Sequence, residues 1–162
     1  MLNVQNLGFS IEGAQLLQSA NVRFEAGSVT ALIGPNGAGK STLLRIMAGL
    51  LPATQGQVMC DGAPLQQLTL VQRARLMAYM PQDVPPFPPM PVREVASLGR
   101  LPYGESSAQA LHHPAVARAL AEVGLQDLAD RPASHLSGGE RARLMLARAW
   151  QCRPPSCWRM NP

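Results

Sequence analysis

The sequence predicts an α/β fold, and three observations carry that prediction. Residues 2–11 alternate between apolar and small or polar side chains, as in a half-buried β-strand. A short apolar run at 29–33 leads directly into a glycine-rich loop, and apolar residues at helical spacing follow that loop. The stretch 92–130 has a helical pattern. We therefore expect an N-terminal antiparallel β part, a buried strand at 29–33 and a helical subdomain.

Strand patterns dominate the chain before the glycine-rich loop. The first strand is expected to place Leu7, Phe9 and Ile11 on one face. Val22 and Phe24 continue the strand pattern in a second segment. Phe9 is in phase with the other core positions, so we expect it in the core.

Further elements follow the loop in chain order. The run "TLLRIMAGLL" predicts a helix that ends near Gly49. The segment "GQVMCDGAPL" predicts a hairpin that turns at Asp61–Gly62. Residues 69–80 predict a short helix and then a strand. The proline-rich stretch 83–92 predicts an extended connecting loop.

Composition limits the class of protein. Hydrophobic residues make up 46% and charged residues 15% of the chain, which is typical of a globular protein. The net charge of +4 favours an acidic partner, such as a nucleotide phosphate, a nucleic acid or an anionic membrane surface. The chain has no run of 18 apolar residues and no leader pattern, so we expect a cytoplasmic protein. Its three cysteines fit neither a disulfide framework nor a zinc site.

The glycine-rich loop fits the phosphate-binding pattern G-x-x-x-x-G-K-[ST]. Glycines allow backbone N–H groups to converge on an anion, and the following helix adds its positive N-terminal dipole. In such a loop the lysine reaches the β- and γ-phosphates, and the serine hydroxyl holds Mg²⁺. The strand before the loop and the helix after it argue against a chance glycine-rich turn. The predicted nucleotide-binding residues are Gly34, Pro35, Asn36, Gly37, Ala38, Gly39, Lys40, Ser41 and Thr42.

A second glycine pair opens a later helix. The stretch "LSGGERARLMLARA" places Ser137 and Glu140 at the spacing of a capping box. Gly138 and Gly139 between them leave bare N–H groups at a helix N-terminus, which can hold a second anion.

The combination of "GPNGAGKST", "MPQ" at 80–82 and "LSGGE" resembles the ATP-binding subunits of ABC transporters. The resemblance covers residues 1–149 and implies the P-loop ATPase fold of that family. It implies that Gly34–Thr42 is the Walker A loop and that Gln82 is the Q-loop glutamine, which contacts Mg²⁺. It also implies that Ser137–Glu140 is the signature motif, which binds the γ-phosphate held by the opposite subunit.

The same resemblance implies MgATP as cofactor, with Ser41 and Gln82 as metal ligands. It implies a head-to-tail dimer of ATP-binding subunits on transmembrane permease subunits, at the inner face of the cell membrane. A substrate-binding protein would act indirectly, and no nucleic acid is expected. The stretch "VREVASLGRLPYG" is similar to importers of iron–siderophore, haem or cobalamin complexes. Many family members stack adenine on an aromatic residue where this chain has Ile11.

The expected organisation has four parts: a nucleotide-binding core at 1–82, a helical subdomain at 83–135, the signature helix at 136–149 and an aberrant tail at 150–162. The family pattern expects a buried strand and Asp-Glu-Pro after "LARA", and later a D-loop and a switch histidine. None of these is found in the 162 residues. Without the Glu, the attacking water has no general base. Without the strands, the parallel sheet keeps an open, apolar edge.

The tail suggests a shifted reading frame. Both tryptophans and two of the three cysteines lie between Trp150 and Trp158. Read one base earlier, an allowed codon choice for 150–162 gives "LAVQAPILLADEP", which supplies the missing strand and both carboxylates. The Trp150–Gln151 junction must then encode alanine, and the Met160–Asn161 junction must encode glutamate, whichever codons are used. We therefore hypothesise a one-base loss near codon 149, in the gene or in its sequence record.

Several functions remain open. The first is the ATPase subunit of an ABC importer, with Lys40 stabilising the transferred phosphoryl group. The second is a non-catalytic fragment that binds nucleotide weakly or does not fold stably, and it is favoured for the literal chain. A soluble ABC ATPase of DNA repair or translation usually has long insertions or two cassettes, and neither is seen. A GTPase or kinase would leave "LSGGE" unexplained.

Overall fold

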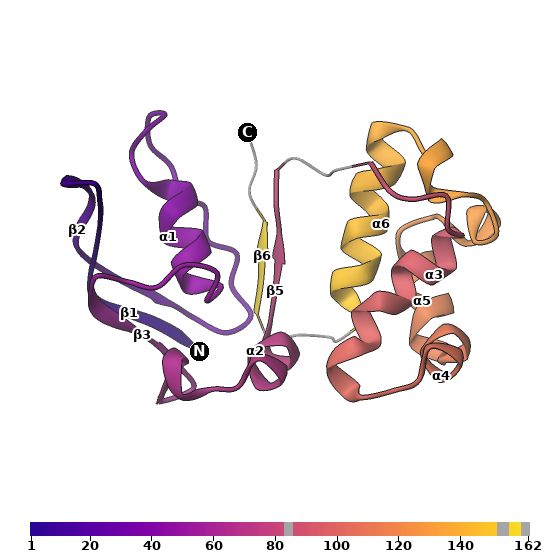
Figure 1. Ribbon diagram of the computed structural model, residues 1–162, viewed down its shortest axis with the longest axis horizontal. Coiled ribbons are helices and arrows are strands. Elements are labelled where there is room, and N and C mark those ends of the chain that lie inside the picture. The colour runs from indigo at the N-terminus through magenta and orange to yellow at the C-terminus, as the bar shows by residue number, and fades with distance from the viewer. Residues whose placement is uncertain (83–85, 152–155, 160–162) are drawn as a thin grey trace. The chain divides into compact units, whose positions relative to one another are not determined.

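The computed structural model describes the backbone of residues 1–82, 86–151 and 156–159, with side chains through Gln151 (Figure 1). The chain divides into two compact units, Met1–Arg73 and Ala74–Pro162. No helix in the described ranges is long and apolar enough to cross a membrane.

The first unit is built on a four-stranded antiparallel sheet with strand order β2-β1-β3-β4. Residues from each of β1 and β3 are buried against the core, including Leu2, Val4 and Val58. Helix α1 contributes Leu43, Ile46 and Met47 to the buried set. The elements of this unit are β1 (Leu2–Ile11), β2 (Ala14–Phe24), α1 (Lys40–Met47), β3 (Gln55–Cys60), β4 (Ala63–Pro64) and the 3₁₀ turn η1 (Leu65–Gln67).

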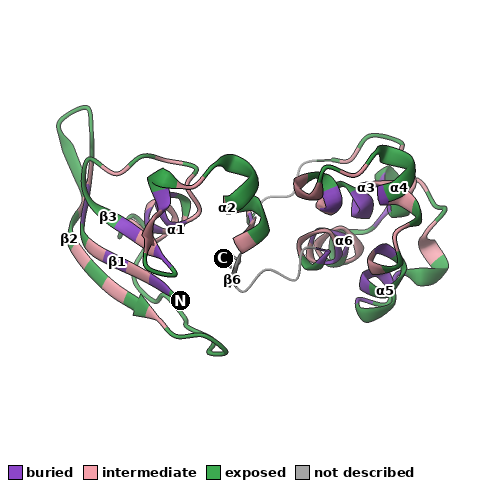
Figure 2. Ribbon diagram, turned by 90° about the horizontal axis from the view of Figure 1, so that it is seen from below, coloured by how far each residue is buried: buried purple, intermediate pink, exposed green. Residues whose placement is uncertain are grey.

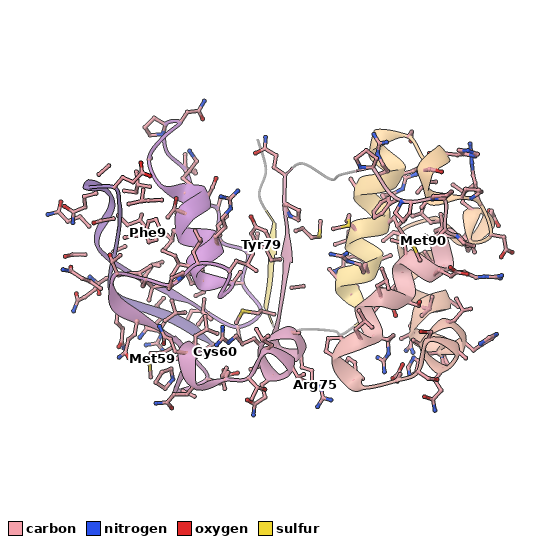
Figure 3. The ribbon with its side chains drawn as sticks, viewed as in Figure 1. Phe9, Met59, Cys60, Arg75, Tyr79 and Met90 are labelled. Atoms are coloured by element: carbon pink, nitrogen blue, oxygen red, sulfur yellow. The ribbon has the colours of Figure 1, made fainter. Side chains whose placement is uncertain are left out.

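The burial expected for the apolar face of the first strand is found only in part. Leu7 is fully buried, whereas Phe9, labelled in Figure 3, is half-buried and Ile11 is 53% exposed. Asn6 has φ of 47°, and an extra residue in β1 shifts the register with β2 before Leu7. After Leu7 the extra residues lie in β2, and Ile11 is the last residue of β1, beside the turn at residues 12–13. Exposure of Ile11 therefore follows from its place at the end of the strand.

The hairpin expected at Asp61–Gly62 is confirmed. Strands β3 and β4 pair antiparallel, and Cys60 lies opposite Ala63. Asp61 and Gly62 have φ of 48° and 86°. Two successive positive φ values match the tight hairpin turn that an Asp-Gly pair favours.

The prediction of a buried strand at 29–33 is wrong. Residues 28–35 form neither helix nor strand, and Val29 and Ile33 are 102% and 91% exposed. A strand of this apolar type is stable only between neighbours that cover both of its faces. No strand in the described part of the chain pairs with this segment. The exposed run agrees with the open, apolar edge expected for an incomplete sheet.

The second unit combines a two-stranded parallel sheet with a helical cluster. Strand β5 follows α2, as expected for residues 69–80, and it pairs in parallel with β6. The sequence did not predict β6. Helix α2 contains the boundary between the units. The bounds are α2 (Leu70–Leu76), β5 (Met77–Met80), α3 (Val92–Ser97), η2 (Leu98–Tyr103), α4 (Ser107–His112), α5 (Pro114–Glu122), η3 (Gln126–Leu128), η4 (Ala133–His135), α6 (Gly138–Trp150) and β6 (Ser156–Arg159).

The helical expectation for 92–130 is confirmed, as several short helices. Pro114 opens α5, and Val116 and Leu120 are buried on one face, as the pattern predicts. Figure 2 shows buried positions on α3, α5 and α6, which together form the core of this unit. Of the proline-rich stretch, residues 83–85 lie outside the described ranges, and the chain from 86 to 90 has no regular structure.

Candidate nucleotide-binding site

The glycine-rich loop turns sharply into α1. Gly37 and Gly39 have φ of 83° and 81°, in the left-handed region that glycine adopts without steric cost. Gly39 is the N-cap residue of α1, and its carbonyl accepts the N–H of Leu43 at 2.8 Å. The loop therefore ends where the first N–H groups of a helix are free to bind an anion.

Gly39 is also required by its neighbours. A Cβ built on it would lie 2.7 Å from the carbonyl oxygen of Leu16 and 2.8 Å from Cδ2 of Leu17. Both atoms belong to β2, so the loop passes directly against that strand. Gly37 has open space at the corresponding position. Gly39 is thus required both by close packing and by backbone conformation, whereas Gly37 is required by backbone conformation alone.

The ammonium group of Lys40 lies over the loop that precedes it. Its Nζ donates to the carbonyl oxygens of Gly34 and Pro35, at 2.7 Å each. The amine is therefore held close to the loop without any bound nucleotide. These two bonds to neutral oxygens are weaker than a charge-assisted bond to phosphate. A phosphate that enters the loop can therefore compete for the amine.

Ser41 and Thr42 lie half-buried in the first turn of α1, beside Lys40. A hydroxyl at this position is a ligand type that Mg²⁺ uses together with phosphate oxygens and water. The donor set of the loop, a lysine amine, helix N–H groups and a hydroxyl, fits a magnesium–nucleotide complex. Gln82 belongs to the other unit, where it is exposed at a bend just after β5.

The second predicted loop forms a complete capping box at the start of α6. The N–H of Ser137 donates to Oε2 of Glu140 at 2.7 Å, and the N–H of Glu140 donates to Oγ of Ser137 at 3.3 Å. The capping-box expectation is therefore confirmed. The hydrogen bonds from Ser137 hold the pKa of the Glu140 carboxyl below its ordinary value.

Gly138 and Gly139 are exposed between these capping residues. A Cβ built on Gly138 would meet nothing within 4 Å, so the first turn of α6 is open to a ligand. The structure thus places Ser137 to Glu140 together at one helix N-terminus. The predicted Walker A residues lie together in the first unit, and the predicted signature residues and Gln82 lie in the second.

Two of the three histidines, His112 and His113, have local partners for their side chains. Nδ1 of His113 accepts the N–H of Ala115 at 3.1 Å and so caps α5. Nδ1 of His112 lies 2.9 Å from the carbonyl oxygen of Ala108. Both rings therefore contact the backbone of the helices beside them.

Sequence reasoning missed a cluster around Arg100. The guanidinium of Arg100 pairs with the carboxylate of Glu105 and lies 4.1 Å from the ring centroid of Tyr103. Arg75 lies 5.1 Å from the same centroid. Arginine and glutamate five residues apart match no helical pairing rule, so the sequence held no signal for this ion pair.

Comparison with known proteins identifies the family. A profile of the ABC transporter family matches residues 17–157 of the chain. The chain belongs to the family of ABC transporter ATP-binding proteins.

Two relatives are named as ATP-binding proteins of import systems. The chain is 41% identical over 143 residues to the hemin import ATP-binding protein HmuV of Streptomyces coelicolor, and the match covers 88% of this chain and 51% of that protein. It is 37% identical over 148 residues to the cobalamin import ATP-binding protein BtuD of Halobacterium salinarum, with 91% and 37% covered. The chain thus spans about half the length, or less, of these two relatives.

Solved structures agree with the fold. A nucleotide-free ATP-binding cassette from an ABC transporter superposes with a TM-score of 0.82 at 27% identity, covering 98% of this chain and 68% of that chain. An ATP-binding subunit of an ABC transporter gives a TM-score of 0.84 at 26% identity, with 98% and 65% covered. The predicted α/β cassette, with an N-terminal antiparallel sheet and a helical part, is confirmed, and the chain covers only part of the full cassette.

Proposed function

We propose that this chain is the Walker A and signature-bearing part of an ABC importer subunit that couples MgATP binding and hydrolysis to transport. The observation that carries the proposal is the loop at 34–42. The proposal is supported by the left-handed glycines of the loop, by the helix N-terminus at its end and by the Lys40 amine, which lies close to the loop carbonyls.

In this proposal the loop holds the nucleotide phosphates, and Lys40 neutralises charge on the transferred phosphoryl group. Ser41 and Gln82 hold Mg²⁺, which neutralises the β- and γ-phosphate oxygens when it is bound. Ser137, Gly138, Gly139 and Glu140 clamp the γ-phosphate of a second subunit. The open first turn of α6 supports this role, because exposed N–H groups at a helix N-terminus attract anions.

The proposed substrate class is an iron complex, haem or cobalamin. Support comes from the names of the two relatives, which are hemin and cobalamin import proteins. The proposed partners are a second ATP-binding subunit, permease subunits that face residues 83–135, and indirectly a substrate-binding protein. The chain would work at the inner face of the cell membrane. The four-part organisation with boundaries at 82, 135 and 149 is retained as part of this proposal.

For the literal 162 residues we propose nucleotide binding without hydrolysis. No acidic residue follows Glu140, so this chain offers no carboxylate after α6 to polarise the attacking water. The exposed run around Val29 and Ile33 also leaves the loop without the strand that normally supports it. The full subunit, with hydrolysis, corresponds to the shifted frame that reads Asp-Glu-Pro.

Titration of the chain with MgATP tests the binding site. We expect Lys40→Ala to weaken MgATP binding by at least tenfold, because the charge-assisted bond to phosphate is lost. Arg45→Ala is the matched control, because it removes an exposed positive charge from the other end of the same helix. Equal affinity of Lys40→Ala and the unmodified chain would contradict the proposed site.

A further inference from the structure

The end of α6 contains a buried polar side chain with no partner. Gln151 is 3% exposed, and neither the nitrogen nor the oxygen of its side-chain amide has a hydrogen-bond partner among the described residues. Burying an amide without hydrogen bonds is unfavourable, and native proteins rarely do so. The side chain at this position therefore does not match its surroundings.

The position is also crowded. A Cβ built on Gly99 would lie 2.1 Å from the carbonyl oxygen of Arg148, and 2.7 Å from both Cβ and Cγ of Gln151. The backbone of η2 thus meets the last turn of α6 at a distance that only glycine permits. Of the two side-chain atoms of Gln151 at this contact, Cβ is shared with alanine and Cγ is not, so alanine leaves more room beside Gly99.

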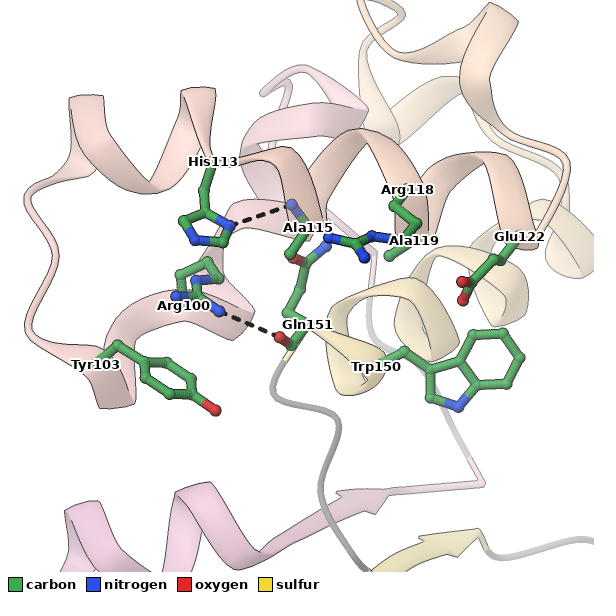
Figure 4. Close-up of a pocket in the computed structure, with 9 residues that line it drawn as sticks. All are labelled: Arg100, Tyr103, His113, Ala115, Arg118, Ala119, Glu122, Trp150 and Gln151. Atoms are coloured by element: carbon green, nitrogen blue, oxygen red, sulfur yellow. Dashed lines mark hydrogen bonds between the residues drawn. The ribbon is translucent and has the colours of Figure 1, made fainter.

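The backbone at this position, in contrast, is well held. The guanidinium of Arg100 donates to the carbonyl oxygen of Gln151 at 3.3 Å (Figure 4). Arg100 is itself paired with Glu105. These contacts use the main chain of residue 151, so they persist with any side chain there. The mismatch is confined to the glutamine side chain.

A cavity of about 280 Å³ lies beside Gln151 and is also lined by Trp150, Arg100 and His113 (Figure 4). A ligand in this cavity could in principle use the glutamine amide. The amide atoms, however, have almost no accessible surface, so they do not reach the cavity contents. The unpaired amide is therefore a packing defect and not a ligand group.

We propose that position 151 is a packing site for alanine, the residue that the shifted reading frame must encode there, and that glutamine destabilises the unit carrying the signature loop. This rests on the proposed function in one respect, the assignment of the tail to a shifted frame. With the codon choice given above, the same frame reads Ile-Leu-Leu-Ala at 156–159, the residues that form β6 beside β5. An apolar run suits a strand of a parallel sheet.

The test is thermal unfolding of the full 162-residue chain without nucleotide, so that a failed ATP site would not affect the result. We expect Gln151→Ala to raise Tm by about 4–8 °C. Gln151→Leu, which removes the amide but keeps the crowding at Gly99, should raise Tm by less. Gln126→Ala, at an exposed site in the same unit, is the control and should shift Tm by no more than about 2 °C.

Two results would overturn the proposal. An unchanged or lower Tm for Gln151→Ala would mean that glutamine is suited to the site. An equal gain for Gln151→Leu would mean that polarity alone, and not size, is at fault. If the parent chain melts too low for a baseline, resistance to limited proteolysis in the cold gives the same ranking.

Discussion

At the residue scale, Lys40 and the two loop glycines define the site. The motif predicts which residues form a phosphate loop, because the spacing of glycine, lysine and serine follows from the geometry of a phosphate. It could not predict that Gly39 passes against Leu16 and Leu17 of β2. Nor could it predict that Lys40 donates to the carbonyls of Gly34 and Pro35. Those contacts depend on how the chain folds around the loop.

Lys40 is the only lysine of the sequence, which allows a direct chemical test. MgATP should protect Lys40 from a lysine-directed acylating reagent, because the amine would be engaged with phosphate. The extent of modification is measured by mass spectrometry of the Lys40 peptide. The N-terminal amine of Met1, which pairs with Asp61, is the internal control and should be modified equally with and without MgATP. Equal modification of Lys40 in both samples would contradict the site.

Glu140 gives a prediction about pH. Hydrogen bonds from Ser137 lower the pKa of its carboxyl in the folded chain from the ordinary value of 4.5. A carboxyl with a lowered pKa stabilises the fold above its unfolded pKa, and that contribution is lost as the pH falls through the folded pKa. The Tm advantage of the unmodified chain over Glu140→Gln should therefore shrink as the pH falls from 6 to about 3.

Thermal unfolding across that pH range measures the effect. Glu122→Gln removes one exposed negative charge from the same unit and controls for the general effect of net charge. A constant difference between the unmodified chain and Glu140→Gln at all pH values would contradict the cap as a source of stability.

At the element scale, α6 follows most of its sequence pattern. The capping box begins the helix, and its buried face includes Leu144, Met145 and Ala147. The first strand follows its pattern only in part, because Ile11 ends β1 beside the turn at residues 12–13 and is 53% exposed. Local alternation gives the face of a side chain but not whether other elements cover that end of the strand.

The core of the helical unit can be tested at Leu144, which is fully buried. Leu144→Ala should lower the free energy of unfolding by about 2–5 kcal/mol, because it removes buried methyl groups and leaves a cavity. Leu101, 66% exposed in η2, is the matched control. Leu101→Ala should change the free energy of unfolding by no more than about 0.5 kcal/mol. Urea unfolding measures both values, and equal effects would contradict the assigned core.

At the scale of the whole molecule, the chain has the ABC cassette fold and covers only part of the full cassette. Residues 29–33 have the composition of a strand buried on both faces, yet Val29 and Ile33 are exposed. The apolar composition of this segment is the reason why a buried strand is expected there. The sequence could not predict the exposure from that segment alone, because burial requires strands supplied by other parts of the chain.

The contribution of Ile33 to the free energy of unfolding should therefore depend on the reading frame. In the 162-residue chain, Ile33→Ala should change the free energy of unfolding by no more than about 0.5 kcal/mol, as expected for an exposed site. In a chain expressed from the restored frame, the same substitution should cost about 2–5 kcal/mol, because the strand would be buried. Urea unfolding of the four proteins measures both values. A similar cost in both frames would contradict the missing-strand account.

The most direct test is to determine the DNA sequence from about codon 140 to well beyond codon 162. The shifted-frame hypothesis predicts one additional base near codon 149, after which the gene reads "LAVQAPILLADEP" and continues through a D-loop and a switch histidine. A verified DNA sequence that encodes 150–162 as given, and whose shifted frame lacks the Asp-Glu pair or meets a stop codon, would contradict it.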